Sequence, residues 1–306
     1  MKVSIGVGVI VALFISPAMA ADMPLKAPPL PPPPVYSWTG FYIGLNAGYT
    51  WSDANVYTNA SNLQFCTGAL VCVNGAATAQ ASALGATGVF PTNPRGFIGG
   101  GQIGYDRQFD SYVAGIEADL QGIANGHSSP GNGVVVPYNF SGAINNVASF
   151  SSVTRGIDDL GTLRGRFGFL VTPGLLVYGT GGLAYGRVSS NTNIAQQYTP
   201  VNPFNILPTN FGAASTSDTR AGWTAGGGLE WILARQWSVK AEYLYYDLGH
   251  VTNGGLLVSG FINPAIVTAP TYYVNNFQST THFNGDIVRL GLNYKFDWGG
   301  AVMARY

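Results

Sequence analysis

The chain has 306 residues, of which only 9% are charged, while 46% are hydrophobic, 13% are aromatic and 42 are glycine. Acidic and basic residues balance at 14 each, so no basic surface is available to bind a nucleic acid. A soluble domain usually carries about 25% charged residues. This deficit indicates that much of the surface faces something other than water, and lipid is the natural candidate.

The N-terminus has the three parts of a secretory signal peptide: a basic Lys2, an apolar run over residues 3–15 and an Ala18-Met19-Ala20 cleavage motif. We interpret residues 1–20 as a signal peptide. A membrane anchor is the alternative, but a spanning helix needs about 20 apolar residues and this run is shorter. The proline-rich segment 21–39 cannot join a sheet, and we interpret it as a periplasmic spacer.

Residues 40–306 have the pattern of a membrane-spanning sheet. Segments of about ten to fourteen residues alternate apolar with small or polar side chains, which is typical of transmembrane strands. Each is long enough for a tilted crossing, which takes about 9 to 11 residues. We predict eight strands, at Gly40–Trp51, Phe97–Phe109, Tyr112–Ile123, Leu160–Val171, Leu175–Val188, Ala221–Ile232, Gln236–Leu248 and Phe283–Phe296.

The connections between these strands alternate strictly between long and short. Outer-membrane barrels have short periplasmic turns, long extracellular loops and both termini in the periplasm. A soluble β-sandwich is the alternative, but it gives no reason for loop length to segregate by end. The sequence therefore predicts an all-β, eight-stranded antiparallel transmembrane β-barrel. The long connections are 52–96, 124–159, 189–220 and 249–282, and the short ones are 110–111, 172–174 and 233–235.

One face of each predicted strand is apolar, and we expect that face to meet lipid. The register places Leu292 outside and Asn293 in the lumen, where a change to serine is expected to be nearly silent. If the strands alternate up and down, the outward aromatic side chains fall at two heights, as interfacial girdles do. One predicted girdle contains Phe41, Tyr105, Tyr112, Phe169, Trp231, Trp237 and Tyr294, and the other Tyr49, Trp51, Phe97, Tyr185, Trp223 and Tyr245.

Charged side chains occupy the opposite face of the strands. Both signs occur in similar numbers, which favours a paired network inside the barrel. Eight strands leave an interior just wide enough for side chains to fill, so a filled lumen is expected in place of an open pore. The predicted lumen network comprises Glu117, Asp119, Arg164, Arg166, Glu230, Lys240, Glu242, Arg289 and Lys295.

The cysteines and histidines provide few candidates for chemistry. Cys66 and Cys72 are predicted to form a disulfide, because the chain is exported and their spacing fits no zinc pattern. His250 and His282 can meet at the outer rim, with Asp247 placed to orient His250, but no motif specifies a nucleophile. His127 lies in a loop. We therefore predict no catalytic residue, no cofactor and no metal site.

Two stretches carry a family resemblance. Residues 38–49 read WTGFYIGLNAGY and residues 291–296 read GLNYKF. Both resemble the small outer-membrane β-barrel proteins of the RopB and outer-membrane immunogenic protein type. The resemblance implies an OmpA-like barrel of abundant surface proteins with roles in envelope integrity and host contact. Members end on a strand-terminal aromatic residue that the barrel-assembly machinery recognises, and here both Phe296 and Tyr306 are candidates.

The leading hypothesis is a structural protein of the Gram-negative outer membrane whose surface loops contact other surfaces. A small diffusion pore of the porin type is the second hypothesis, and a lipid-modifying enzyme is the third. The expected partners are outer-membrane lipid, the barrel-assembly machinery and an extracellular ligand or surface that loop composition does not identify.

Overall fold

The computed structural model describes residues 37–63, 69–140, 142–199, 210–261 and 271–296. The chain divides into two units, Met1–Val35 and Tyr36–Tyr306, and all described residues belong to the second. The predicted signal peptide, most of the spacer and Tyr306 lie outside the described residues. No helix in the described ranges is long and apolar enough to cross a membrane.

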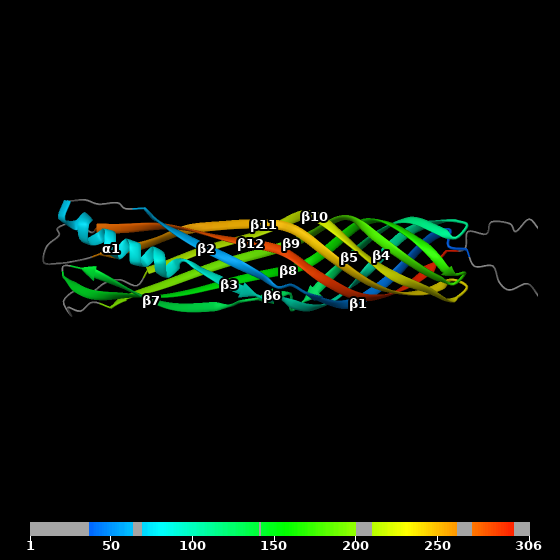
Figure 1. The fold of residues 1–306 in the computed structure, drawn as a ribbon, viewed down its shortest axis with the longest axis horizontal. Coiled ribbons are helices and arrows are strands. Elements are labelled where there is room, and N and C mark those ends of the chain that lie inside the picture. Colours follow the sequence, from blue (N-terminus) through cyan, green and yellow to red (C-terminus); the bar gives the residue numbers. More distant parts are fainter. Residues whose placement is uncertain (1–36, 64–68, 141, 200–209, 262–270, 297–306) are drawn as a thin grey trace, which may run out of the picture. The chain divides into compact units, whose positions relative to one another are not determined.

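Eight antiparallel strands of the described residues form a closed ring in the order β1-β4-β5-β8-β9-β10-β11-β12 (Figure 1). The ring closes because β1 also pairs with β12, with Leu45 opposite Leu292. The predicted eight-stranded barrel is therefore present. Its strands are β1 Gly40–Trp51, β4 Arg95–Phe109, β5 Tyr112–Ala124, β8 Ala143–Thr172, β9 Leu175–Thr199, β10 Asn210–Ala234, β11 Trp237–Phe261 and β12 Thr271–Lys295.

The short connections lie where the sequence predicts them, within one residue. Asp110 and Ser111 join β4 to β5, and Asp110 adopts a left-handed φ of 51°, which aspartate tolerates in a turn. Pro173 and Gly174 join β8 to β9, where proline fixes the turn and cannot continue the strand. Two residues likewise join β10 to β11. We call this the short-turn end of the barrel.

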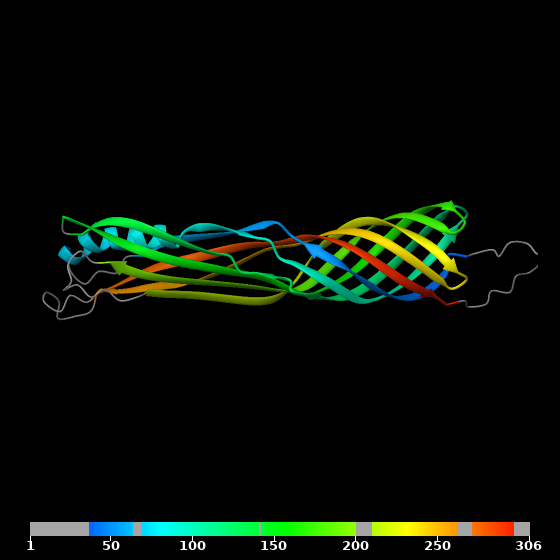
Figure 2. The same cartoon turned by 90° about the horizontal axis from the view of Figure 1, so that it is seen from below.

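The long connections are not the irregular loops that the sequence suggests. The first contains β2 Ala54–Leu63, helix α1 Ala69–Ala86 and β3 Gly88–Thr92, and the second contains β6 His127–Ser128 and β7 Gly131–Phe140. The predicted strands were also too short at this end, because β8 to β12 each run 25 to 30 residues. These segments mix serine, threonine and asparagine on both faces, so their alternation is weak in the sequence. We call the part of the sheet beyond the barrel the extension (Figure 2).

Two groups of strands face each other in the extension. One is β7-β8-β9-β10 and the other β11-β12-β2-β3; Phe211 of β10 and Val258 of β11 still join the two groups, but from there to Trp223 the pairing of β10 with β11 is interrupted. Helix α1 links the two groups from inside. The Ser82 hydroxyl donates to Gln196 Oε1 of β9 at 2.6 Å, and the Asn275 amide of β12 donates to Ser82 Oγ at 2.8 Å.

The predicted facing agrees with the exposure of the side chains. Phe41, Leu45, Phe97, Trp223 and Leu292 are all exposed, although they are large and apolar. The outward aromatic rings form contacts at two heights, as expected for two girdles. At the short-turn end the pairs are Phe41–Tyr105, Tyr112–Phe169 and Trp237–Tyr294, and at the other end Tyr49–Phe97 and Trp223–Tyr245.

Substitutions at two neighbouring glycines test which residues point into the lumen and which point outward. A Cβ added at Gly100 would lie 2.6 Å from Gln121 Cα, whereas at Gly99 the nearest atom would be the Asn46 carbonyl oxygen at 3.8 Å. We expect Gly100→Ala to cost about 1 to 3 kcal/mol, because backbone must shift to admit the methyl group. Gly99→Ala should stay within about 0.5 kcal/mol of the parent, since its methyl group enters open space. Urea unfolding of the two refolded variants measures the difference, and equal stabilities would contradict the facing.

Candidate functional site: the filled lumen

The inward side chains of the barrel form successive layers from the short-turn end to the extension. Strand β12 shows the order along a single strand. Asn293 and Arg289 are polar or charged, Ile287 and Phe283 are apolar, and Thr281 is polar and uncharged. All five are buried. The neighbouring strands repeat this order, so each layer extends across the lumen.

Trp38 closes the short-turn end. Its side chain is fully buried, and the indole N–H donates to the Pro173 carbonyl oxygen at 3.2 Å. The Lys295 ammonium donates to the Trp38 carbonyl oxygen at 2.8 Å and lies 4.9 Å from the centre of the indole ring. Val113, Leu176 and Tyr178 pack with Trp38 in one apolar cluster. The last residues of the predicted spacer are thus part of the barrel base.

The structure places the nine predicted network residues together in the lumen, immediately above this base. Eight are buried and Lys295 is mostly buried. A tenth residue, Asp106, is fully buried among them and was missing from the predicted set. The network therefore contains five acidic and five basic side chains and has no net charge. Its acidic members are Asp106, Glu117, Asp119, Glu230 and Glu242, and its basic members are Arg164, Arg166, Lys240, Arg289 and Lys295.

Arg164 is at the centre of the larger cluster. Its guanidinium lies 2.5 Å from Glu117, 2.9 Å from Asp119 and 3.0 Å from Glu242. Arg289 contacts Asp119 at 2.8 Å and Glu242 at 2.6 Å. Lys240 Nζ donates to both oxygens of Glu117 at 2.7 Å. Each carboxylate thus has at least two cationic neighbours, which is what offsets the cost of burying charge.

Arg166 organises a second cluster nearer the base. It contacts Glu230 at 2.5 Å, lies 3.6 Å from Asp106, and stacks over the Tyr178 ring at 4.2 Å. The Tyr42 hydroxyl joins the two clusters, because it accepts a hydrogen bond from Arg166 at 3.1 Å and donates to Glu117 at 2.7 Å. Tyr42 was not in the predicted set. Its inward parity in β1 is the signal that would have included it.

The contacts of Asn293 change the expected effect of replacing it with serine. Its amide nitrogen donates to Glu230 Oε1 at 2.9 Å, and its amide oxygen accepts a hydrogen bond from Gln102. Replacing it with serine removes partners from two buried polar groups, so we expect a loss of stability where the sequence alone predicts a nearly silent change.

An apolar layer separates the charge network from the extension. It contains Ile98, Ile157, Leu160, Ala184, Val188, Leu244, Tyr246, Leu248, Val251, Phe283 and Ile287, all buried. Arg155 lies at its outer border, fully buried, and donates to Ser52 Oγ at 2.9 Å and to the Asn284 carbonyl oxygen at 3.0 Å. Its guanidinium is 5.2 Å from the centre of the Phe283 ring. Beyond Arg155 the described interior mixes uncharged polar side chains, among them Ser190, Thr192, Asn253 and Thr281, with small apolar clusters such as Val56, Phe90 and Val153.

The rim histidines approach each other as the sequence suggests, but the aspartate contacts the other ring. His250 and His282 stack, with ring centres 4.1 Å apart, but Asp247 binds His282 Nε2 at 3.0 Å and does not orient His250. His127 lies 3.4 Å from Asp158. Within the described residues neither stacked histidine is hydrogen-bonded to a hydroxyl group, and no three His, Cys, Asp or Glu side chains are grouped to hold a metal ion.

The predicted cysteine pair cannot be placed. Cys66 lies outside the described residues, and Cys72 belongs to α1 at a position whose side chain is not described. The disulfide stays a prediction.

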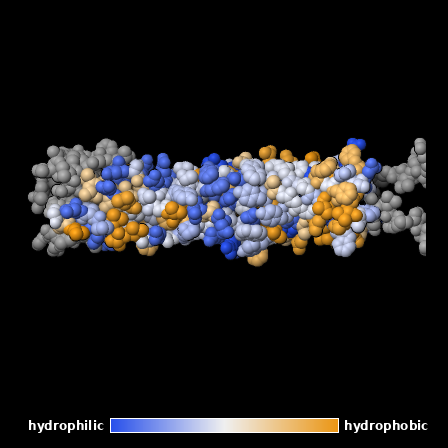
Figure 3. Space-filling model, viewed as in Figure 1, coloured by the Kyte–Doolittle hydropathy of each residue, from blue (hydrophilic) through white to orange (hydrophobic). Residues whose placement is uncertain are grey.

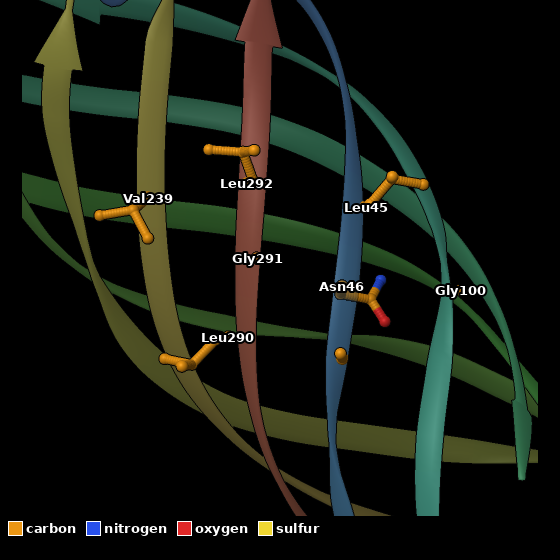
Figure 4. A pocket seen from close by; sticks show the side chains of 8 residues that line it. Leu45, Asn46, Gly100, Val239, Leu290, Gly291 and Leu292 are labelled. Atoms are coloured by element: carbon orange, nitrogen blue, oxygen red, sulfur yellow. The ribbon is translucent and has the colours of Figure 1, made fainter.

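A groove lies on the outer face of the barrel, where β11, β12, β1 and β4 adjoin. Leu45 and Ala47 of β1 and Leu290 and Leu292 of β12 line it, and Figure 4 shows the leucines on neighbouring strands. Because its outward side chains are apolar, this groove offers contact to hydrocarbon. The charged side chains of the barrel lie on the other side of the wall.

A closed antiparallel barrel with an apolar outer face, two aromatic girdles and charged side chains inside defines a membrane-spanning barrel. The sequence matches the family described as "Outer membrane protein beta-barrel domain" over residues 9–296, and the chain belongs to this family. It is therefore an outer-membrane protein of a Gram-negative bacterium, so the short-turn end is periplasmic and the extension is extracellular.

Several relatives bear names of the same kind. The chain is 31% identical to the 31 kDa outer-membrane immunogenic protein of Brucella melitensis over 300 residues, which covers 94% of this chain and 97% of that protein. It is 26% identical to the 25 kDa outer-membrane immunogenic protein of Brucella abortus, covering 78% and 80%. Among solved structures it is similar to the outer membrane protein OprG from Pseudomonas aeruginosa, at 12% identity and a TM-score of 0.36, covering 85% and 97%.

Proposed function

We propose that this protein is a structural surface protein of the outer membrane, with a closed lumen and an extracellular extension that contacts other surfaces. The observation that carries the proposal is the sequence of layers in the lumen. An ion that enters the barrel from the short-turn end would meet the apolar cluster around Trp38 first. It would then meet the network of ten charged side chains, and after that the apolar layer. The relatives named as immunogenic support a surface-exposed role.

The two other hypotheses receive less support. A diffusion pore needs a water-filled lumen, which belongs to barrels of about 16 to 18 strands. A lipid-modifying enzyme needs a nucleophile beside a base, and the described histidines of the rim contact aspartate and each other.

We expect the folded wild-type protein to show no steady, large conductance in a planar bilayer, because paired side chains occupy the lumen. The measurement is single-channel recording after reconstitution, with a wide porin as the positive control. Heat-dependent gel mobility of protein recovered from the same vesicles establishes that folded barrel was present. Brief flickering is compatible with rearranging ion pairs, whereas a stable ohmic channel would falsify the closed lumen and favour the pore.

A further inference from the structure

A row of apolar side chains crosses the outer face of the extension. Phe150 of β8 is paired with Ala195 of β9, Ala195 with Phe211 of β10, and Phe211 with Val258 of β11. Since these residues are direct cross-strand neighbours on one face, they form a continuous line, which we call the transverse row. Phe211 lies twelve residues along β10 from Trp223 of the outer girdle, which corresponds to about 40 Å of strand.

The transverse row is as exposed as the surface that faces lipid. Phe150 is 68% exposed and Phe211 is 69% exposed, which equals the 69% of Phe97 in the girdle. Leu256 and Val135 add further exposed apolar side chains to the same face. On the face drawn in Figure 3, hydrophobic side chains likewise gather over both the barrel and the extension, with more hydrophilic surface between them. The row lies far outside the outer aromatic girdle, so water and not hydrocarbon surrounds it.

The strands around the row carry no charge. The segments 131–140, 142–154, 189–199, 210–217 and 251–258 contain no aspartate, glutamate, lysine or arginine. A charged face would repel a second copy of itself, and this face has no such barrier. It also gives an anionic or cationic ligand nothing to pair with.

We propose that the transverse row is the contact between two copies of this chain in the same outer membrane. Anchoring holds the barrels parallel, so the row of each copy stands at the same height and can face the row of its neighbour. A two-fold contact uses the same patch on both copies. This inference does not depend on whether the lumen conducts.

The side chains of the transverse row are spaced so that two copies of the row can interlock. Two phenylalanines stand on either side of Ala195, about two strand spacings or roughly 10 Å apart. The Phe150 ring leans over Gly133, where an added Cβ would lie 3.1 Å from the ring, so it packs away from Ala195. The space above Ala195 can therefore receive a phenylalanine ring from the second copy.

The size of the face indicates where the contact forms. Five strands and six residues along each span about 400 Å² per copy, or roughly 800 Å² in total. Stable complexes in solution bury about 1,200 to 2,000 Å². Confinement in one membrane raises the effective concentration of the two copies, so the contact should form in membranes and dissociate in dilute detergent.

Cysteine cross-linking in intact outer membranes tests the proposal. In a Cys66→Ser, Cys72→Ser background, Ala195→Cys treated with a short bifunctional maleimide should yield a band of twice the monomer mass. The matched control is Asn59→Cys, which is exposed on β2 in the other group of strands. We expect at least about fivefold more dimer at position 195, because random collisions sample both positions equally.

A second substitution tests whether the cross-link depends on packing of the phenylalanine side chains or only on the two copies being close in the membrane. Phe211→Asn in the Ala195→Cys protein should lower the dimer yield toward that of the Asn59→Cys control, while heat-dependent gel mobility shows that the barrel is folded. Equal yields at positions 59 and 195 would overturn the proposal. A cross-link from position 195 to a different protein would overturn it as well, since the row would then have another occupant.

Discussion

Replacing Arg164 with alanine should destabilise the folded barrel by about 3 to 5 kcal/mol, because it removes the central cation and leaves buried carboxylates with too little positive charge beside them. Arg164 contacts three of them, Glu117, Asp119 and Glu242, and its side chain is fully buried. Two other cations, Lys240 and Arg289, stay beside these carboxylates, but neither reaches the position that the guanidinium occupies between them.

Urea unfolding of the refolded protein, followed by heat-dependent gel mobility, measures this loss. The matched control is Arg187→Ala, because Arg187 forms an exposed pair with Asp159 at 3.9 Å. Exposed pairs contribute about 0 to 1 kcal/mol, so the control should unfold close to the wild type. If Arg164→Ala were no less stable than Arg187→Ala, the network would not support the fold.

Leu292→Arg should cost about 2 to 4 kcal/mol, since it places a charged side chain on the hydrocarbon-facing wall. Leu292 is 45% exposed on β12 and has Leu45 as its direct neighbour on β1. The cost arises mainly from placing a charge against hydrocarbon, because nearly half of the leucine is exposed on that wall.

The same substitution at another exposed leucine isolates this effect. Leu84 on α1 is 58% exposed but lies in the extension, where water meets it. Leu84→Arg should therefore change stability by less than about 0.5 kcal/mol. Refolding into vesicles followed by denaturant titration compares the two variants, and similar losses would show that the wall position of Leu292 is misassigned.

The barrel could be predicted from the sequence because two strong signals agree there. The strict alternation in segments such as 40–51 assigns a face to each side chain, and the contrast between short and long connections assigns an end to each strand. The extension gave neither signal. At 149–153 the buried residues include the polar Ser149 and Ser151 while the apolar Phe150 is exposed, so the apolar face does not mark the interior as it does in the barrel.

The network was predicted as a set of residues but not as a set of contacts. Parity alone places Arg164 and Glu242 in the lumen, whereas their 3.0 Å contact depends on the register between strands that are not neighbours in the sheet. Asp106 has the same inward parity in β4 and was overlooked near a strand end. Trp38 falls outside the predicted barrel, because the proline-rich composition predicts spacer up to residue 39 although Trp38 is fully buried.

The pairing of β1 with β12 has a consequence for assembly. Leu45 and Leu292 are direct partners although nearly the whole chain separates them, so this seam has the highest contact order in the barrel. Until β12 is present, β1 and β11 both expose unpaired backbone groups, which a bilayer does not satisfy. A chain lacking residues 271–296 would therefore have two open edges and no lipid-compatible wall, which makes the last strand the step that commits the protein to the membrane.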